Sequence, residues 1–201
     1  VLRDSGGVRV DHIIGLFRLW WIPAGGTPAD GTYVHYDHEA LLGILVLEAQ
    51  RAGAVVIGED LGVVAPHVRD YMMERGLVGT SILWFEWEDD RPKPPEHYRD
   101  LCLSTVTTHD LPPSAGYLSL EHVAIREELG LLARPVEEER AQEEASIAKL
   151  RDACVARGLL QPGAGIDAVV EALHRWMALT PSRMLAVALA DVVGDHRAVN
   201  Q

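Results

Sequence analysis

Three short apolar runs of the sequence end in side chains that could carry acid–base or nucleophilic chemistry. The runs are followed by Asp11 and His12, by Glu59 and Asp60, and by His109 and Asp110. If the runs are parallel strands of a barrel, their carboxyl ends open onto one face, where such folds place their reactive groups. Carboxylates and imidazoles gathered in one pocket are costly unless they are paired or used. The pattern therefore predicts one shared cleft.

Each of these groups also has a plain structural explanation. A carboxylate after a strand is about as often a helix cap or a loop residue, and Asp60 and Asp100 are well explained in that way. His12 could simply donate a hydrogen bond to a backbone carbonyl. The structural explanation weakens because the same feature recurs after three runs in one strand–helix frame.

The residue types favour glycoside chemistry over the alternatives. No serine or cysteine stands in a G-x-S-x-G elbow, so a serine-type nucleophile has no motif support. No metal site is predicted, because Asp11 and His12 are neighbours on an expected strand, where side chains alternate, and no HExxH spacing occurs. Two carboxylates about 5–5.5 Å apart suit a retaining glycosidase-type reaction, with one as nucleophile and the other as acid and base.

The elements that must position these residues form an α/β pattern. Apolar runs predict strands, and longer stretches with helix start and stop signals predict helices between and after them. Strands are expected at Val8–Val10, Ala54–Gly58, Ser81–Phe85 and Leu103–Thr107, with Met184–Ala190 open between strand and helix. Helices are expected at Glu39–Gln50, Pro66–Arg75, Glu121–Gly130, Pro135–Arg157 and Asp167–Leu179. Strand–helix–strand repetition implies parallel strands in one α/β domain, with a helical insertion at about residues 118–180.

Composition narrows the class of partner. The chain has 201 residues and a net charge of −12, which argues against a general nucleic-acid binder and leaves a neutral sugar substrate open. No run is long and apolar enough for a membrane span, and the first residues, VLRDSGG, lack the charged and apolar pattern expected of a signal peptide. Cys102 and Cys154 lack metal-ligand spacing, so reduced, packed thiols and a cytoplasmic location are expected. No nucleotide motif or cofactor signature occurs.

Five segments resemble one known family. They are GGVRVDHIIGLFRLWWIP, GTYVHYD, VIGEDLG, TTHDLPPSAGY and TPSRMLAVALADVVGDHRAVN. Together they resemble the 4-α-glucanotransferases (amylomaltases of the MalQ type, glycoside hydrolase family 77), over nearly the whole chain. RVDH, GEDLG and THD in this order are typical of the wider α-amylase clan, and GLFRLWWIP narrows the resemblance to this family.

The resemblance implies a fold and roles for named residues. The fold would be a partial (β/α)8 TIM barrel, about strands 4 to 8, with inserted helices. Asp11 corresponds to the nucleophile, Glu59 to the general acid/base and Asp110 to the third carboxylate, which holds sugar hydroxyls. Further substrate contacts are expected from Arg9, His12, His109, Tyr33 and Phe85.

The implied reaction moves α-1,4-glucan segments between maltooligosaccharides through a covalent glycosyl-enzyme, with no cofactor or metal. Donor and acceptor would be maltooligosaccharides or starch- and glycogen-type glucans. Two alternatives stay open: an α-glucan hydrolase of the same clan, and an inactive glucan-binding fragment.

Residues 1–201 are read as the C-terminal portion of the catalytic barrel, because the first three barrel strands have no counterpart in the sequence. Such a piece would expose two sheet edges. We therefore expect it to associate with itself or with a missing N-terminal half, and to be inactive alone.

Overall fold

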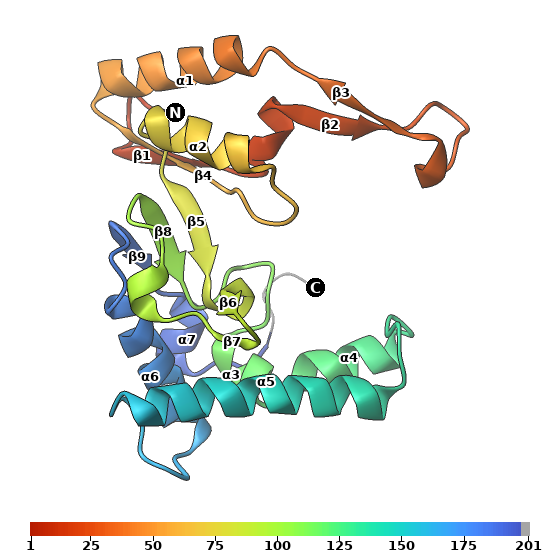
Figure 1. Ribbon diagram of the computed structural model, residues 1–201, viewed down its shortest axis with the longest axis vertical. Helices are drawn as coiled ribbons and strands as arrows, with labels where there is room; N and C mark the ends of the chain where they lie inside the picture. The colour runs from red at the N-terminus through yellow and green to blue at the C-terminus, as the bar shows by residue number, and fades with distance from the viewer. Residues whose placement is uncertain (198–201) are drawn as a thin grey trace. The chain divides into compact units, whose positions relative to one another are not determined.

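The computed structural model describes residues 1–197, which form two compact units (Figure 1). The first unit holds residues 1–80 and 101–103, and the second begins at residue 81 and takes in the remainder. The last four residues, including the end of the TPSRMLAVALADVVGDHRAVN motif, lie outside the described part. Mixed α/β content agrees with the prediction from the sequence.

The first unit is built on a parallel strand pair. Strand β1 (Gly7–Val10) pairs with β4 (Val55–Gly58), and the predicted parallel direction is confirmed for this pair. Helices α1 (His38–Ala52) and α2 (Pro66–Glu74) pack on it through an apolar core. That core contains Ile13, Phe17, Leu42, Ala49, Val56, Val68, Met72 and Leu77.

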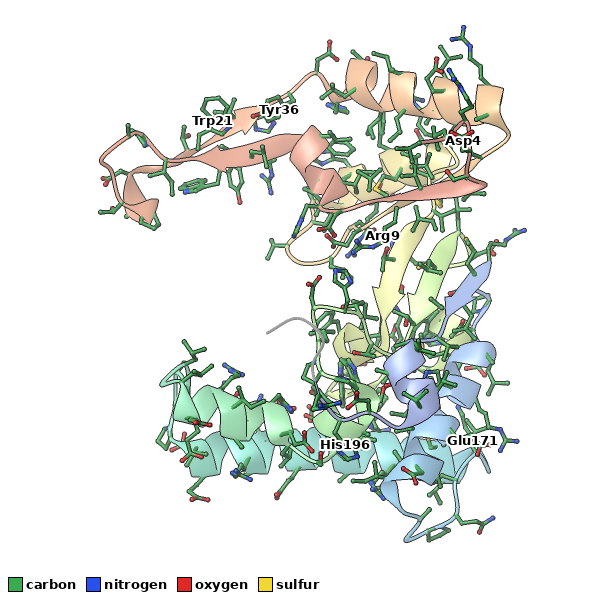
Figure 2. All side chains as sticks on the ribbon, turned by 180° about the vertical axis from the view of Figure 1, so that it is seen from behind. Asp4, Arg9, Trp21, Tyr36, Glu171 and His196 are labelled. Atoms are coloured by element: carbon green, nitrogen blue, oxygen red, sulfur yellow. The ribbon has the colours of Figure 1, made fainter. Side chains whose placement is uncertain are left out.

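An antiparallel hairpin that the sequence pattern did not predict projects between β1 and α1. It joins β2 (Arg18–Trp21) to β3 (Thr32–His35). It exposes the aromatic side chains of Trp20, Trp21 and Tyr33. Trp20 contacts Tyr33 edge to face, and the Trp21 indole N–H donates to the Tyr36 hydroxyl over 2.8 Å (Figure 2).

A three-stranded sheet follows, in the order β5 (Gly79–Ile82), β8 (Cys102–Thr105), β9 (Met184–Ala186). The expected strand Ser81–Phe85 was displaced along the chain, because β5 begins two residues earlier and Leu83–Phe85 forms a 3-10 helix. The stretch Met184–Ala190, for which strand and helix were both left open, contains strand β9 and then the start of helix α7 (Leu189–Val193). A short hairpin pairs β6 (Trp87–Glu88) with β7 (Arg91–Pro92).

Helices dominate the second unit. The predicted acidic and amphipathic stretches are confirmed as α4 (Glu121–Glu128), α5 (Val136–Ala156) and α6 (Ile166–Ala178), preceded by the short α3 (Ser114–Leu118). Both cysteines are buried and free, as expected, and burial raises the pKa of the Cys154 thiol to about 11. Among the described residues, no helix combines the length and apolar content needed to cross a bilayer.

Two backbone features fix the turn at the carboxyl ends of β1 and β4. His12 follows β1 in the left-handed region (φ 46°, ψ 49°) and begins a 3-10 helix, Ile13–Leu16. Gly58 ends β4 under that helix: a Cβ there would lie 2.6 Å from Ile13 Cδ1 and 2.7 Å from Met72 Cε. A side chain at position 58 would thus push Ile13, and with it the turn, away from the strand pair.

We predict that Gly58→Ala lowers the free energy of unfolding by about 1–3 kcal/mol, the usual cost of overpacking a filled core. The matched variant is Gly43→Ala in α1, where an added Cβ meets nothing within 4 Å. It should raise stability by about 0.5–1 kcal/mol, because alanine favours a helix interior over glycine. Urea denaturation of the two variants measures both changes, and equal shifts would contradict the packing argument.

We also predict that His12→Val is less stable than His12→Asn by about 1–2 kcal/mol. Asparagine tolerates the left-handed conformation, whereas a β-branched residue does not. Urea midpoints of the two variants test this, and indistinguishable midpoints would show that the turn relaxes.

Candidate functional site

The register of β1 and β4 brings Asp11 and Glu59 together. Val10 is paired with Gly58, so the residues that follow the two strands leave the sheet side by side. Two backbone hydrogen bonds continue the pairing: the Glu59 N–H donates to the Val10 carbonyl over 2.9 Å, and the Ile13 N–H donates to the Glu59 carbonyl over 3.0 Å. The sequence-based prediction that these strand ends meet is confirmed within the first unit.

The Glu59 carboxylate is almost fully buried, with its side chain 7% exposed. Both of its oxygens accept from backbone N–H groups. His12 N donates to Oε2 over 3.0 Å, and Leu61 N donates to Oε1 over 2.6 Å. Since backbone donors do not rotate freely, they hold the carboxylate in one orientation.

Asp11 has a different environment, because its side chain is half exposed. Arg9 Nη1 lies 2.8 Å from Asp11 Oδ1, so the two side chains lie on the same side of the chain. Figure 2 shows Arg9 near the end of β1. The guanidinium supplies a fixed positive charge beside the carboxylate.

His12 lies between the two acids. Its Nδ1 is 3.1 Å from Asp11 Oδ2, and its Nε2 is 4.0 Å from Glu59 Oε2. The expectation that Asp11 and His12 point to opposite sides was wrong, because β1 ends at Val10 and the left-handed His12 turns back toward Asp11.

One ligand atom from each of Asp11, His12 and Glu59 can be chosen so that all three lie within 4.8 Å of one another. Such a set could in principle ligate a cation. However, the Arg9 guanidinium and two backbone N–H groups already bind these carboxylates, so a cation would have to displace or oppose them. The arrangement suits two carboxylates acting on a neutral substrate better than it suits a metal.

His109 and Asp110 follow β8 in the second unit. His109 Nε2 lies 3.3 Å from Asp110 Oδ2, and both side chains are more than half exposed. The pair is accessible for hydrogen bonding to a ligand. That Asp110 joins Asp11 and Glu59 around one substrate stays a prediction.

The two aromatic candidates are both exposed: Tyr33 is 49% exposed and Phe85 is 57% exposed. The Tyr33 ring contacts Trp20, and the Arg18 guanidinium lies 4.1 Å from its centroid. Phe85 ends the 3-10 helix after β5. Their contact with substrate stays a prediction.

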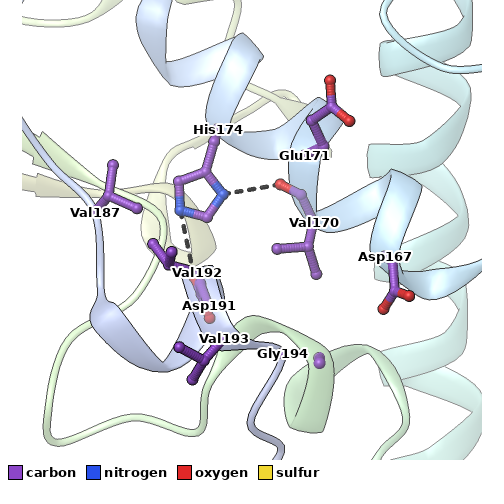
Figure 3. Close-up of a pocket in the computed structure, with 10 residues that line it drawn as sticks. Asp167, Val170, Glu171, His174, Val187, Asp191, Val192, Val193 and Gly194 are labelled. Atoms are coloured by element: carbon purple, nitrogen blue, oxygen red, sulfur yellow. Dashed lines mark hydrogen bonds and ion pairs between the residues drawn. The ribbon is translucent and has the colours of Figure 1, made fainter.

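The second unit also holds a separate cavity of about 640 Å³, whose lining includes four valines and the polar residues Asp167, Glu171, His174 and Asp191 (Figure 3). Two of these polar residues form structural links. Asp191 accepts from the Ser114 N–H and hydroxyl over 2.7 and 2.6 Å, and His174 Nε2 lies 3.4 Å from Asp191. These contacts tie α3, α6 and α7 together.

Asp60 was misread from the sequence. It was explained as a cap or surface residue, but its side chain is only 1% exposed. The signal was the period-two alternation of β4: Val56 and Gly58 are buried, and Asp60 continues their face. Asp100, by contrast, is a surface residue that pairs with Arg183 over 2.6 Å.

Comparisons with known proteins identify the family of the chain. The family model described as 4-alpha-glucanotransferase matches residues 1–201. A 4-alpha-glucanotransferase of Mycobacterium tuberculosis is 59% identical over the whole chain, which spans 29% of that relative's length. A Haemophilus influenzae 4-alpha-glucanotransferase is 37% identical over 65% of the chain, which covers 19% of that relative.

Among solved structures, amylomaltase from Corynebacterium glutamicum matches the whole chain with a TM-score of 0.94 and 48% identity, and 30% of that protein is covered. Amylomaltase from Streptococcus agalactiae, solved with acarbose, matches 94% of the chain with a TM-score of 0.65 at 18% identity, which shows the fold alone. The chain thus spans less than a third of these relatives. On the family model and these identities, the chain belongs to the 4-alpha-glucanotransferase family.

Proposed function

We propose that the chain supplies the catalytic carboxylates of a retaining 4-α-glucanotransferase acting on maltooligosaccharides. The observation that carries the proposal is the placement of Asp11 and Glu59 at adjacent strand ends, with carboxylate oxygens within 4.8 Å. Oxygens this close suit retaining enzymes, whose carboxyl groups are about 5–5.5 Å apart, rather than inverting enzymes, whose carboxyl groups lie about 6.5–9.5 Å apart to leave room for a water molecule.

The environments of the two acids suit two different roles. Asp11 lies beside the Arg9 guanidinium, which orients it, and is half exposed, which suits a nucleophile that a substrate can reach. Glu59 is buried, and its orientation is fixed by two backbone donors. A carboxyl group held in this way can deliver a proton to one place and take it back from there.

In the first half of the reaction, an Asp11 oxygen attacks the anomeric carbon of the donor. The glycosidic C–O bond breaks, and Glu59 gives its proton to the departing oxygen. In the second half, the 4-hydroxyl of an acceptor attacks the same carbon. Its proton goes to Glu59, the bond to Asp11 breaks, and both acids return to their starting state.

The remaining residues act on the sugar. Arg9 orients Asp11, and His12 borders the ring between the two acids. Asp110 and His109 bind sugar hydroxyls, contacts that strengthen as positive charge builds on the ring. Tyr33 and Phe85 offer exposed rings for stacking. Transfer prevails over hydrolysis when the acceptor excludes water from the glycosyl-enzyme.

The finer architecture belongs to the same proposal. The described strands would form about strands 4 to 8 of a (β/α)8 barrel, and a further part of the protein would pair with β1. In the described part of the chain β1 has β4 as its single partner, and its residues Val8 and Val10 line a hollow of about 600 Å³. Leu2 and Leu45 line it too, beside the charged Arg3, Glu48 and Arg51, so a partner would bury a partly apolar surface there.

We predict that Glu59→Gln in the intact gene product lowers maltotriose disproportionation by about 10²–10⁴-fold, the usual contribution of general acid–base catalysis. Glucan binding should persist, because the amide keeps the size of the carboxylate. Chromatography of the oligosaccharide products gives the rate, and calorimetry gives the binding. The matched control is Glu39→Gln at the exposed start of α1, which should leave the rate unchanged.

The products decide between the two enzyme classes. Oligosaccharides longer than maltotriose identify transfer, whereas glucose and maltose alone identify hydrolysis. A Glu59→Gln variant with full activity would remove Glu59 from the mechanism.

We further predict that residues 1–201, produced alone, self-associate and do not disproportionate maltotriose. The edge of β1 that lacks a partner among residues 1–197, and the partly apolar hollow that Val8 and Val10 line, favour association. Light scattering measures the mass, and the maltotriose assay measures activity. A monomer with full activity would overturn this prediction.

A further inference from the structure

We propose that Asp60 is a positioning residue for Glu59. Its buried carboxylate holds the acid/base in place by accepting the Thr80 N–H hydrogen bond that a regular strand pairing would direct to a backbone carbonyl. The inference rests on the proposed function. It assigns a role to a residue that does not itself touch the sugar.

One parallel bridge, between Ile57 and Val78, joins β4 to the residue before β5, and its backbone ladder stops at Gly58. The Val78 N–H donates to the Val56 carbonyl over 3.0 Å, and the Gly58 N–H donates to the Val78 carbonyl over 2.7 Å. Continued regularly, a parallel ladder would next direct the Thr80 N–H to the Gly58 carbonyl.

Two side chains make the next rung instead. The Thr80 N–H donates to Asp60 Oδ1 over 2.8 Å, and the Thr80 hydroxyl donates to the Gly58 carbonyl over 3.1 Å. Each backbone group is satisfied, yet the chain leaves the ladder after Gly58. Glu59 is therefore free to turn toward β1 while the residues on both sides of it stay attached to β5.

Arg69 of α2 holds Asp60 from a third direction. Its Nε lies 3.4 Å from Asp60 Oδ2, and its Nη2 donates to the Asp60 carbonyl over 3.3 Å. The Asp60 side chain is only 1% exposed, and a buried carboxylate is costly unless it is paired and hydrogen-bonded. The partners that compensate this cost also fix the backbone of Asp60.

The consequence falls on Glu59. Gly58 and Asp60 are anchored toward Thr80, while the Glu59 backbone is tied to Val10 and Ile13 and its carboxylate to His12 and Leu61. The Glu59 carboxylate therefore has little room to move. A general acid must lie within a fraction of an ångström of its productive position, and about 1 Å of misplacement can cost 10²-fold in rate.

The test is Asp60→Asn in the intact gene product, assayed with two donors. Maltotriose needs a proton from Glu59 to release its leaving sugar. α-Maltosyl fluoride does not, because fluoride departs as a stable anion. We expect kcat for maltotriose to fall about 10–100-fold with little change in KM. The rate of fluoride release in the first turnover should fall far less than kcat for maltotriose.

The matched control is Asp100→Asn, which also removes a carboxylate paired with an arginine, but at an exposed site. It should leave both donors unaffected. A general loss of folded enzyme would lower the two rates of Asp60→Asn equally. Equal losses, or no loss with maltotriose, would overturn the inference.

Thr80→Val provides a second variant if Asp60→Asn fails to fold. It removes the hydroxyl bond to the Gly58 carbonyl and keeps the Thr80 N–H. The same preference for fluoride over maltotriose is expected, with a smaller loss, and equal loss on both donors would overturn the inference.

Glu59→Gln serves as the reference, since it should show the same donor dependence more strongly. If Glu59→Gln shows no donor dependence, the acid assignment itself fails. If Glu59→Gln shows it and Asp60→Asn does not, the positioning role alone fails.

Discussion

The parallel pairing of β1 with β4 is the constraint on which the site depends. Its register sets Val10 opposite Gly58, so that the residue after each strand emerges beside the other. A slip of one residue would turn the next side chains to the opposite face of the sheet and separate the two acids. The backbone bonds from Glu59 to Val10 and from Ile13 to Glu59 carry that register one step beyond the strands.

The same pairing gives two chemically identical groups unlike surroundings. The Asp11 side chain is half exposed and pairs with Arg9, two residues earlier in the chain. Glu59 emerges beneath the turn of His12, where backbone N–H groups bind it and solvent hardly reaches. Carboxylates in contrasting environments can take contrasting parts in one reaction, so a single strand register determines both distance and role.

The local pattern of apolar and polar residues was sufficient to predict the strands that support the site. Apolar runs bounded by polar residues and glycine located β1, β4 and β8 within about two residues, because burial on a strand leaves a short-range signature. The β2–β3 hairpin was not predicted from the sequence. Its partners Trp20 and Tyr33 stabilise each other across a long loop, and its strands do not alternate clearly between buried and exposed residues. Pairing of that kind depends on contacts between residues distant in the chain.

His12 and Asp60 mark the limit of reasoning from residue types. Nothing in the letters RVDH shows that the histidine takes a left-handed backbone, yet that conformation brings its ring to Asp11 and its N–H to Glu59. Asp60 looked like a loop carboxylate because acidic residues are seldom buried. It is buried here because Thr80 and Arg69 converge on it from β5 and α2. In both cases the tertiary fold supplies the partners, and those partners constrain the backbone that carries the reactive groups.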